Sequence, residues 1–389
     1  MAVIFFLGAA HGLILALVLS RKQVNKLPNQ LLALLMIAFS VDLGMAALQS
    51  FGILEHYPQL IGLDYPVTLL YGPLLYLYVK TMKEGHKSLQ KIDYLHFLPF
   101  LVLLIYLLPF YFGSATDKLA LLRGNIQQVQ STYGLDFITS LKVTHGLLYV
   151  AGVVYMLISY RRRLKDSYSS IERINLNWLQ HFITGAALLA IIAGGVYFLN
   201  FANNTVVGSS GGIYVDITLL AVTGFVFGIG YMGLHQPEVF SDTVQEARLE
   251  TGTINWEVEA MEKYQKSGLE EEQAVHLQRQ LITLMETQKL YRDSDLKLAD
   301  LAENLEITPH NLTEVINRYI GQNFYDFINS YRVDEVKSRL RNSDYEEKTL
   351  LAVALDAGFN SKSTFNAVFK KQTGMTPSQY RRKKSEDNT

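Results

Sequence analysis

LLAVALDAGFNSKSTFNAVFKKQTG, residues 350–374, carries the clearest structural pattern in the sequence. Apolar residues at helical spacing lead up to Gly358, and a second apolar stripe that includes Phe365 and Phe369 follows it. Gly358 suits a tight turn, because glycine adopts positive φ angles without steric cost. Ser361 is placed to cap the second helix through its side-chain oxygen. The stretch therefore predicts a helix-turn-helix.

A second copy of this pattern lies upstream in LADLAENLEITPHNLTEVINRYIG, residues 298–321. Ala302 lies 52 positions before Ala354, and a small residue at this position lets the two helices cross closely. Thr308 is placed as the cap of the second helix in this copy. Between the copies, residues 323–341 carry an apolar stripe at helical spacing. They predict a bridging helix that sets the separation of the two motifs.

Residues 358–382 resemble the second helix-turn-helix signature of AraC/XylS-type transcription regulators, with GF, F-x-x-x-F-K-K, G-x-T-P and Y-R-R in order. Residues 298–340 are similar to the first helix-turn-helix and bridging helix of that family. The resemblance covers about 95 residues of the 389. Glu306 is one departure, because family members often have glycine there. A second departure is that apolar runs occupy the place of the usual soluble ligand-binding domain.

The resemblance implies that the second helix of each motif enters a major groove, with the two insertions about one helical turn of DNA apart. Asn side chains suit adenine, whereas Lys and Arg suit guanine or phosphate. The net charge of residues 290–384 is only +2, so we expect modest non-specific affinity. The alternative for each polar residue of these second helices is that it is exposed to solvent and does not contact DNA. The candidate DNA-binding residues are His310, Asn311, Thr313, Asn317, Arg318, Ser361, Lys362, Ser363, Thr364, Asn366, Lys370, Arg381 and Arg382.

A connector, residues 235–289, precedes this domain and begins with a change of composition at His235-Gln236-Pro237. Residues 254–265 and 269–290 both show apolar residues at helical spacing. The second of these begins with acidic residues, which favour the positive end of a helix dipole. Packing of this helix on the C-terminal domain is favoured over dimerisation.

The first 234 residues are built from long apolar runs, and a run of about 20 residues can span the hydrocarbon core as a helix. A soluble helix bundle is the alternative, but stretches such as LVLLIYLLPFYF lack the polar faces that it would need. The sequence therefore predicts an all-α protein, with a seven-transmembrane-helix bundle followed by a cytoplasmic domain of two helix-turn-helix motifs. The seven runs are 2–20, 29–51, 65–82, 93–112, 137–160, 179–201 and 212–234.

The charges between the runs predict an orientation. With the N-terminus outside, the inner loops carry twelve Lys and Arg residues, whereas the outer loops carry two, Lys118 and Arg123. This bias is typical of a positive-inside topology, which places everything after residue 234 in the cytoplasm. Because Arg21 and Lys22 follow the first run and no cation precedes it, that run predicts a span rather than a cleavable signal peptide.

Five ionisable residues inside the runs fall in the predicted outer half of the bundle: His11, Asp42, Lys142, His145 and Asp216. Such residues are costly in hydrocarbon and usually face a bundle interior or a water-filled cavity. One interpretation is structural, with Lys142 paired to Asp42 or Asp216. The other is a pocket, open to the outside, that senses a ligand or protons. Metal binding by His11 and His145 is less favoured than either of these interpretations, so we predict no metal site.

Several classes of function are excluded. The chain has no cysteine, which excludes disulfides and cysteine-ligated metal sites. P-loop, Rossmann, HExxH and GxSxG patterns are also missing from the sequence, so we predict no enzyme activity and no cofactor.

We therefore predict a transcription regulator of the bacterial inner (plasma) membrane that couples a signal sensed by the bundle to sequence-specific promoter binding. Its expected partners are double-stranded DNA, membrane lipid, a small-molecule or extracytoplasmic signal, and a second copy of the chain. One alternative is an anchored regulator released by proteolysis. Another is a receptor or transporter-like protein whose helix-turn-helix domain binds a protein partner. The predicted domains are a sensor bundle (1–234), the connector (235–289), a DNA-binding domain (290–384) and a tail (385–389).

Overall fold

The chain, described here by a computed structural model, forms two compact units. The first unit comprises residues 1–157 and 176–253, and the second comprises residues 158–175 and 254–389. All regular elements among the described residues are helices, which confirms the all-α class for them. The structure describes residues 1–23, 25–84, 88–122, 135–171, 177–202, 213–235, 269, 271–342, 345 and 347–387.

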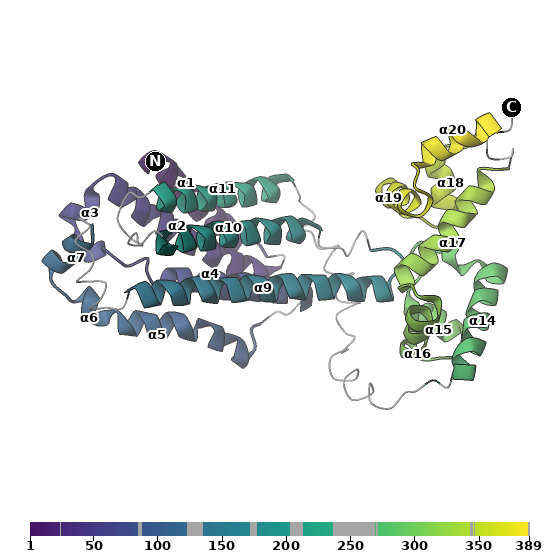
Figure 1. Cartoon of the computed structure of the whole chain (residues 1–389), viewed down its shortest axis with the longest axis horizontal. Coiled ribbons are helices and arrows are strands. Elements are labelled where there is room, and N and C mark those ends of the chain that lie inside the picture. Colours follow the sequence, from purple (N-terminus) through teal and green to yellow (C-terminus); the bar gives the residue numbers. More distant parts are fainter. Residues whose placement is uncertain are drawn as a thin grey trace. The chain divides into compact units, whose positions relative to one another are not determined.

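Long helices that lie alongside one another dominate the first unit (Figure 1). Shorter helical pieces connect them. The long elements are α1 (Ala2–Ser20), α2 (Lys26–Ser50), α4 (Tyr71–Glu84), α9 (Leu135–Ser167), α10 (Asn177–Ala202) and α11 (Ile213–His235). The shorter ones are α3 (Ile53–His56), η1 (Pro58–Leu60), η2 (Val67–Leu70), η3 (Lys91–Phe97), α5 (Leu98–Tyr106), α6 (Leu108–Tyr111) and α7 (Ala115–Leu122).

The predicted count of seven spans is confirmed only in part. Within the described residues, four helices rather than seven are long and apolar enough to cross a membrane. These helical stretches are Ala2–Ser20, Lys26–Ser50, Phe137–Ser167 and Leu179–Leu199, and the apolar part of α11, Asp216–Met232, is shorter.

Two of the predicted spans are interrupted for a local reason. In the run 65–82, a 3₁₀ turn (η2) precedes a helix of only 14 residues. The run 93–112 is divided at Leu107, between α5 and α6, where Pro109 takes an early position of the new helix. Proline lacks the N–H that would continue the preceding helix. An apolar run therefore sets an upper limit on helix length, not the length itself.

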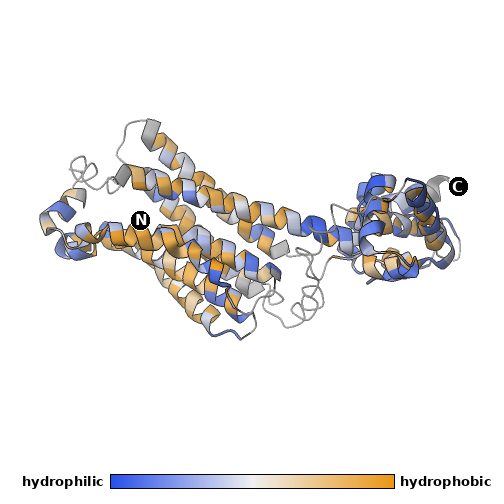
Figure 2. Cartoon of the chain, turned by 90° about the horizontal axis from the view of Figure 1, so that it is seen from below, coloured by the Kyte–Doolittle hydropathy of each residue, from blue (hydrophilic) through white to orange (hydrophobic). Residues whose placement is uncertain are grey.

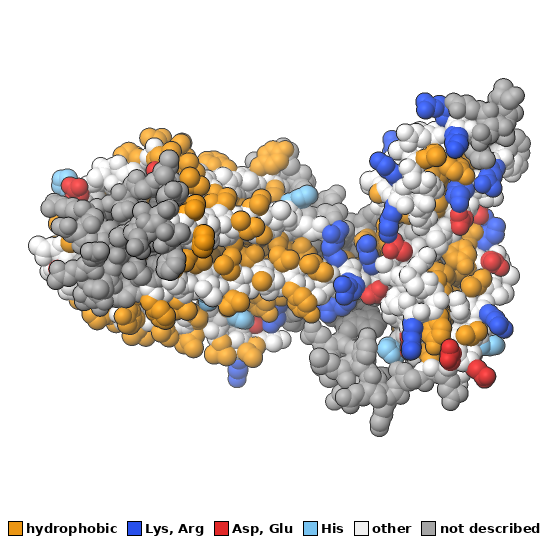
Figure 3. Space-filling view, viewed as in Figure 1, with side chains coloured by type: hydrophobic (Ala, Val, Ile, Leu, Met, Phe, Trp, Pro, Cys, Tyr) orange, Lys and Arg blue, Asp and Glu red, His pale blue; other side chains and the backbone are white. Residues whose placement is uncertain are grey.

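The outer surface of the first unit is apolar. Large side chains such as Phe6, Ile105 and Ile191 are more than half exposed. The helices of this unit are largely orange in Figure 2, and orange side chains cover much of the face seen in Figure 3. Soluble proteins rarely expose apolar area on this scale, whereas helices that face lipid require it.

Close packing of α1 on α2 depends on a stripe of small residues. Gly8, Gly12 and Ala16 share one buried face of α1. A Cβ atom on Gly12 would overlap the Oγ of Ser40 in α2, which itself donates to the carbonyl of Met36 at 2.8 Å. Small residues four apart allow two helix backbones to approach closely in this way.

In the second unit, a hydrophobic core joins α14 to the first motif. Ala274, Leu281 and Met285 of α14 are fully buried in it, together with residues of both helices of the first motif. The predicted amphipathic stretch 254–265 lies outside the described residues, as do all of 236–268 and residue 270. The elements are α14 (Glu271–Gln288), η5 (Leu290–Arg292), α15 (Leu298–Asn304), α16 (Pro309–Glu314), η6 (Val315–Ile320), α17 (Phe324–Arg339), α18 (Leu350–Asp356), α19 (Lys362–Thr373) and α20 (Pro377–Asp387).

Candidate nucleic-acid interface and bundle cavity

Two helix pairs in the second unit repeat the same turn. The first is α15 with α16, and the second is α18 with α19. Ala302 and Ala354 are both fully buried where the helices cross. The N–H of Ile307 donates to the carbonyl of Ala302 at 3.0 Å, and that of Phe359 donates to Ala354 at 3.1 Å. The offset of 52 residues seen in the sequence is thus an offset between equivalent hydrogen bonds.

The two turns differ at one backbone position. Glu306 has φ +55°, and Gly358, its equivalent 52 residues later, has φ +100°. A Cβ on Gly358 would lie 2.5 Å from the carbonyl oxygen of Tyr291, so only glycine fits there. Glu306 therefore occupies a left-handed conformation that favours glycine, at the position where the sequence departs from the family.

The second helix of each motif begins with a capping side chain. Thr308 accepts a hydrogen bond from the N–H of Asn311, and Ser361 accepts one from Thr364, both at 3.2 Å. The caps are 53 residues apart rather than 52, because the second turn contains one additional residue, Asn360.

The two recognition helices differ in form. In the first motif, α16 passes into a π-helical turn, η6, whereas α19 is α-helical throughout. Both end at a glycine with positive φ, Gly321 and Gly374. π-helical turns are rare in proteins, and those that do occur often lie at functional sites.

The bridging helix α17 packs against elements of both motifs. Phe324, Phe327 and Ile328 of α17 are buried in the core that holds the first motif. This arrangement gives the two recognition helices a common support.

The candidate DNA-binding residues differ in exposure. The exposed ones are Asn317, Arg318, Lys362, Ser363, Asn366, Lys370 and Arg382. The half-buried ones are His310, Asn311, Thr313, Ser361, Thr364 and Arg381.

Known proteins match this part of the chain. Residues 301–383 match the family model of a helix-turn-helix domain. The chain carries an AraC-type helix-turn-helix domain. No solved structure matches the chain.

Two relatives share the AraC-type domain region. The melibiose operon regulatory protein of Escherichia coli (strain K12) is 32% identical over 90 residues, which is 23% of this chain and 29% of the relative. An uncharacterized HTH-type transcriptional regulator of Staphylococcus aureus (strain COL) is 32% identical over 93 residues, 24% of this chain and 12% of the relative. The chain thus spans under a third of either relative, and the similarity concerns the AraC-type domain alone.

Some of the candidate DNA-binding side chains already have partners within the AraC-type domain. Arg381 donates to the carbonyl of Lys348 at 2.8 Å, which ties α20 to the segment before α18. Arg318 forms an ion pair with Glu314 at 3.3 Å, although the Arg318 side chain remains 71% exposed. Ser361 caps α19. Arg318 is therefore accessible to a partner, whereas Arg381 and Ser361 make hydrogen bonds that stabilise the domain itself.

Glu335, on α17 of the AraC-type domain, has a set of hydrogen-bond partners that the sequence did not reveal. Glu335 accepts hydrogen bonds from Tyr291 at 3.1 Å, from Arg339 at 2.9 Å and from Arg292. Burial favours the neutral acid, but the hydrogen bonds from Arg292 and Arg339 outweigh it and lower the pKa of Glu335. Only the i,i+4 pair with Arg339 was visible in the sequence; the other partners are brought together by folding.

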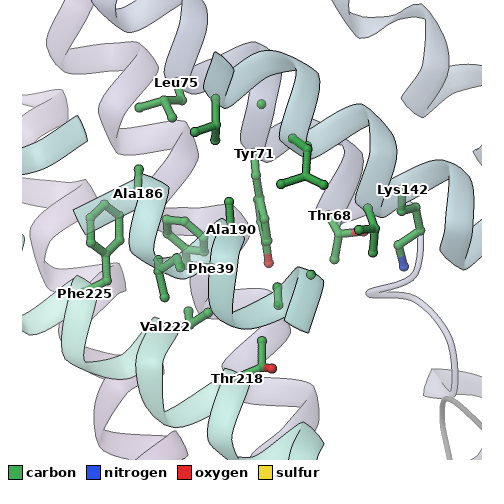
Figure 4. Close-up of a pocket in the computed structure, with 18 of the residues that line it drawn as sticks. Phe39, Thr68, Tyr71, Leu75, Lys142, Ala186, Ala190, Thr218, Val222 and Phe225 are labelled. Carbon is green, nitrogen blue, oxygen red and sulfur yellow. The ribbon is translucent and has the colours of Figure 1, made fainter. Parts of the chain in front are cut away.

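The first unit contains a cavity of about 270 Å³ between its long helices. It is lined by residues of α2, η2, α4, α9, α10 and α11. Figure 4 shows Phe39, Ala186 and Phe225 toward one side, with Thr68 and Lys142 toward the other. The cavity is therefore apolar at one end and polar at the other.

The polar end contains two of the five predicted sensing residues, Asp42 and Lys142. The hydroxyl of Tyr71 donates to Asp42 at 2.9 Å, and the Lys142 ammonium lies 4.9 Å from the ring centroid of Tyr65. Lys142 also interacts electrostatically with Asp42 and with Asp64. Asp64 was not among the predicted residues, because it lies between two apolar runs, where an acidic residue is not unusual.

The other three predicted sensing residues are not among those that line this cavity. His11 stacks on Phe227 with ring centroids 4.6 Å apart, and His145 lies 4.7 Å from the ring of Tyr149. Asp216 occupies the first turn of α11. The described residues bring no group of three or more metal-ligating side chains together.

Proposed function

We propose that this chain is a membrane-embedded transcription regulator, in which the AraC-type domain binds specific DNA and the first unit senses a signal. The observation that carries the proposal is the repeated turn, with its second helix exposing polar side chains in each motif. The Escherichia coli and Staphylococcus aureus relatives, both named as regulators, support it.

Base recognition is assigned chiefly to α19. Lys362, Asn366 and Lys370 are exposed on this helix. Asn can pair with adenine through two hydrogen bonds, and Lys can donate to guanine or phosphate. Asn317 and Arg318 supply the same chemistry on the first recognition helix.

The test is selection of double-stranded DNA from a random pool by the full chain in lipid nanodiscs. We expect one defined site, and we expect Lys362→Ala with Asn366→Ala to weaken binding to it at least about tenfold. Lys337→Ala is the control, because Lys337 already pairs with Asp334 on its own helix at 2.8 Å. A chain that enriches no DNA sequence would instead favour a protein partner for the domain.

Membrane embedding is proposed from three observations: four candidate spans, an apolar outer surface, and Lys and Arg residues concentrated in alternate segments between the apolar runs. Since the AraC-type domain requires access to DNA, the basic segments are assigned to the cytoplasm of a bacterium. This topology needs seven crossings, so the proposal includes the runs 65–82, 93–112 and 212–234, which would cross the membrane as shorter or interrupted helices. A soluble C-terminal fragment that appears only on induction would instead support release by proteolysis.

The proposed signal is a small amphiphile that enters the cavity of the first unit. The arrangement in Figure 4 supports this, because Thr68 and Lys142 lie toward one side of the cavity, while Ala186 and Phe225 lie toward the other. A ligand with one hydrogen-bonding or charged group and a short apolar body matches both ends.

Reporter output from the selected DNA site tests this assignment. We expect Asp42→Ala and Lys142→Ala to change the output. We expect the same of Ala190→Leu, because the larger side chain would fill part of the cavity. Asp216→Ala serves as control, because Asp216 is not among the lining residues. Output identical to that of the native chain in all three cavity variants, at equal amounts in the membrane, would contradict ligand sensing by this cavity.

A further inference from the structure

A segment from far upstream in the sequence forms part of the second unit. Residues 158–175 group with 254–389. Within them lie residues 168–171, which we name the strap, and Tyr168, Ser169 and Ser170 of the strap contact the AraC-type domain. Tyr168 forms an antiparallel bridge with Lys297. The N–H of Ser169 donates to the carbonyl of Leu296 at 3.2 Å, and Ser169 is only 1% exposed. The strap is therefore seated on the segment that leads into α15.

The strap provides partners for a buried arginine of the bridging helix. Arg332 is 1% exposed and donates to the carbonyl of Ser169 at 3.2 Å and to its hydroxyl at 3.0 Å. It also donates to the carbonyls of Tyr291 and Asp293, both at 2.7 Å. Asn329, which is fully buried, donates to the same Ser169 carbonyl at 3.3 Å. Release of the strap would remove the two Ser169 acceptors from the buried donors Arg332 and Asn329. A buried charged group that loses hydrogen-bond acceptors costs free energy of folding.

The strap also reaches the turn of the second motif. Asn360, the residue that this turn has in addition to the first, donates to the hydroxyl of Ser170 at 2.8 Å. The same amide contacts the carbonyl of Ser294 and a carboxylate oxygen of Asp295, both at 3.2 Å. Asn360 directly precedes Ser361, the cap of α19. The strap thus joins the approach to α15, the bridging helix and the start of the second recognition helix.

The seated strap leaves the recognition surfaces open. Lys362, Ser363 and Asn366 of α19 remain exposed with the strap in place, as do Asn317 and Arg318 in the first motif. The conformation with the strap seated is therefore compatible with DNA binding, and an inhibitory role by direct masking of these residues is not supported.

We propose that the strap is a control element: seated on Arg332 and Asn360, it holds the two helix-turn-helix motifs in the arrangement that binds DNA, and its release lowers DNA affinity. This inference rests on the proposed DNA-binding function. Its route to the signal is the chain itself, because α9 is one helix from Leu135 to Ser167 and ends one residue before the strap. A change in the part of α9 that lines the cavity has a direct covalent path to the strap.

The absence of cysteine from the native chain allows a direct test. Residues paired across an antiparallel bridge have Cα atoms about 4.5–5.5 Å apart, which suits a disulfide. The full chain with Tyr168→Cys and Lys297→Cys is reconstituted in nanodiscs, and its affinity for the selected DNA site is measured oxidised and reduced. The single variant Tyr168→Cys under the same oxidant is the control.

A second variant releases the strap without altering any residue of the AraC-type domain. Ser169→Pro removes the N–H that bonds to Leu296 and the hydroxyl that accepts from Arg332. We expect Ser169→Pro to weaken DNA binding about tenfold, and the oxidised crosslink in the same chain to restore affinity. Ser170→Ala, which removes one of the three acceptors of Asn360, provides a milder variant if Ser169→Pro fails to fold.

Three outcomes separate the hypotheses. Native-like affinity of the oxidised crosslink, with weaker binding by the released variants, supports the strap as a control element. An oxidised form that binds more weakly than the reduced form, or released variants with native affinity, would overturn it. A native chain that selects no DNA site at all would instead overturn the proposed function.

Discussion

Glu306 and Gly358 show how one backbone angle limits the choice of residue. Both have positive φ in equivalent turns, yet only Gly358 has a carbonyl oxygen where a Cβ would lie. A left-handed conformation costs a non-glycine residue about 1–2 kcal/mol. The first turn tolerates this strain because it is not crowded in the same way.

We therefore predict opposite effects for two substitutions. Glu306→Gly should stabilise the second unit by up to about 1 kcal/mol, since relief of strain exceeds the added entropy of the unfolded chain. Gly358→Ala should destabilise it by about 2 kcal/mol or more, because the methyl group would overlap the Tyr291 carbonyl. Thermal unfolding of the two variants beside the native chain measures both effects. Equal stability of the two variants would contradict the difference in crowding between the two turns.

Glu335 gives a second residue-scale prediction. Glu335→Gln should lower the free energy of unfolding by about 1–2 kcal/mol near neutral pH, because charge-assisted hydrogen bonds to Arg292 and Arg339 are weakened. The pKa of Glu335 is lowered in the folded chain, so its contribution is present above the unfolded pKa and is lost as pH falls through the folded one. The gap between native and variant chains should accordingly shrink below about pH 4. Denaturant unfolding at pH 7 and pH 3.5 checks this, and a gap that widens in acid would refute it.

Among the elements, α1 and α2 illustrate packing by small residues. Gly12 on α1 faces Ser40 of α2, whereas a Cβ on Gly44 of α2 would meet nothing within 4 Å. The two glycines lie in neighbouring candidate spans and differ chiefly in what surrounds them.

This contrast predicts the effect of two matched substitutions. Gly12→Val should destabilise the first unit by about 2 kcal/mol through overpacking, whereas Gly44→Val should change stability by less than about 0.5 kcal/mol. Thermal unfolding in a mild detergent, monitored by helical circular dichroism, compares them. Similar losses for both variants would show that glycine flexibility, not close approach, sets the stability here.

At the scale of the whole molecule, the proposed topology rests on the asymmetry of loop charge. Ser88 lies in a loop assigned to the cytoplasm, and Ser114 lies in one assigned to the outside; both are exposed. Since the native chain has no cysteine, each can carry the only thiol of the protein.

We predict that Ser114→Cys reacts with a membrane-impermeant maleimide added to intact cells, while Ser88→Cys reacts only after the cells are lysed. The native chain, which has no thiol, reports the background of the labelling. The reverse pattern would invert the topology and would place the AraC-type domain on the side away from DNA.

The helix-turn-helix motifs were accessible from sequence because they depend on local rules. The caps at Thr308 and Ser361, the buried Ala302 and Ala354, and the tight turns follow from residue type and spacing within about 25 residues. The count of spans was less accessible, because hydropathy alone does not reveal where Leu107 interrupts an apolar run. Of the five candidate sensing residues, only Asp42 and Lys142 line the cavity.

By itself, the sequence determined the all-helical class, the two motifs, their caps and the asymmetry of charge between the apolar runs, because these depend on period, residue type and charge along the chain. Only the tertiary structure decided which polar residues converge: Asp64 with Lys142, Glu335 with Arg292, and Ser169 with Arg332. Convergence depends on helix rotation and on how remote segments pack. The contact between Ser169 and Arg332 joins residues 163 positions apart, a separation over which periodicity in the sequence carries no information.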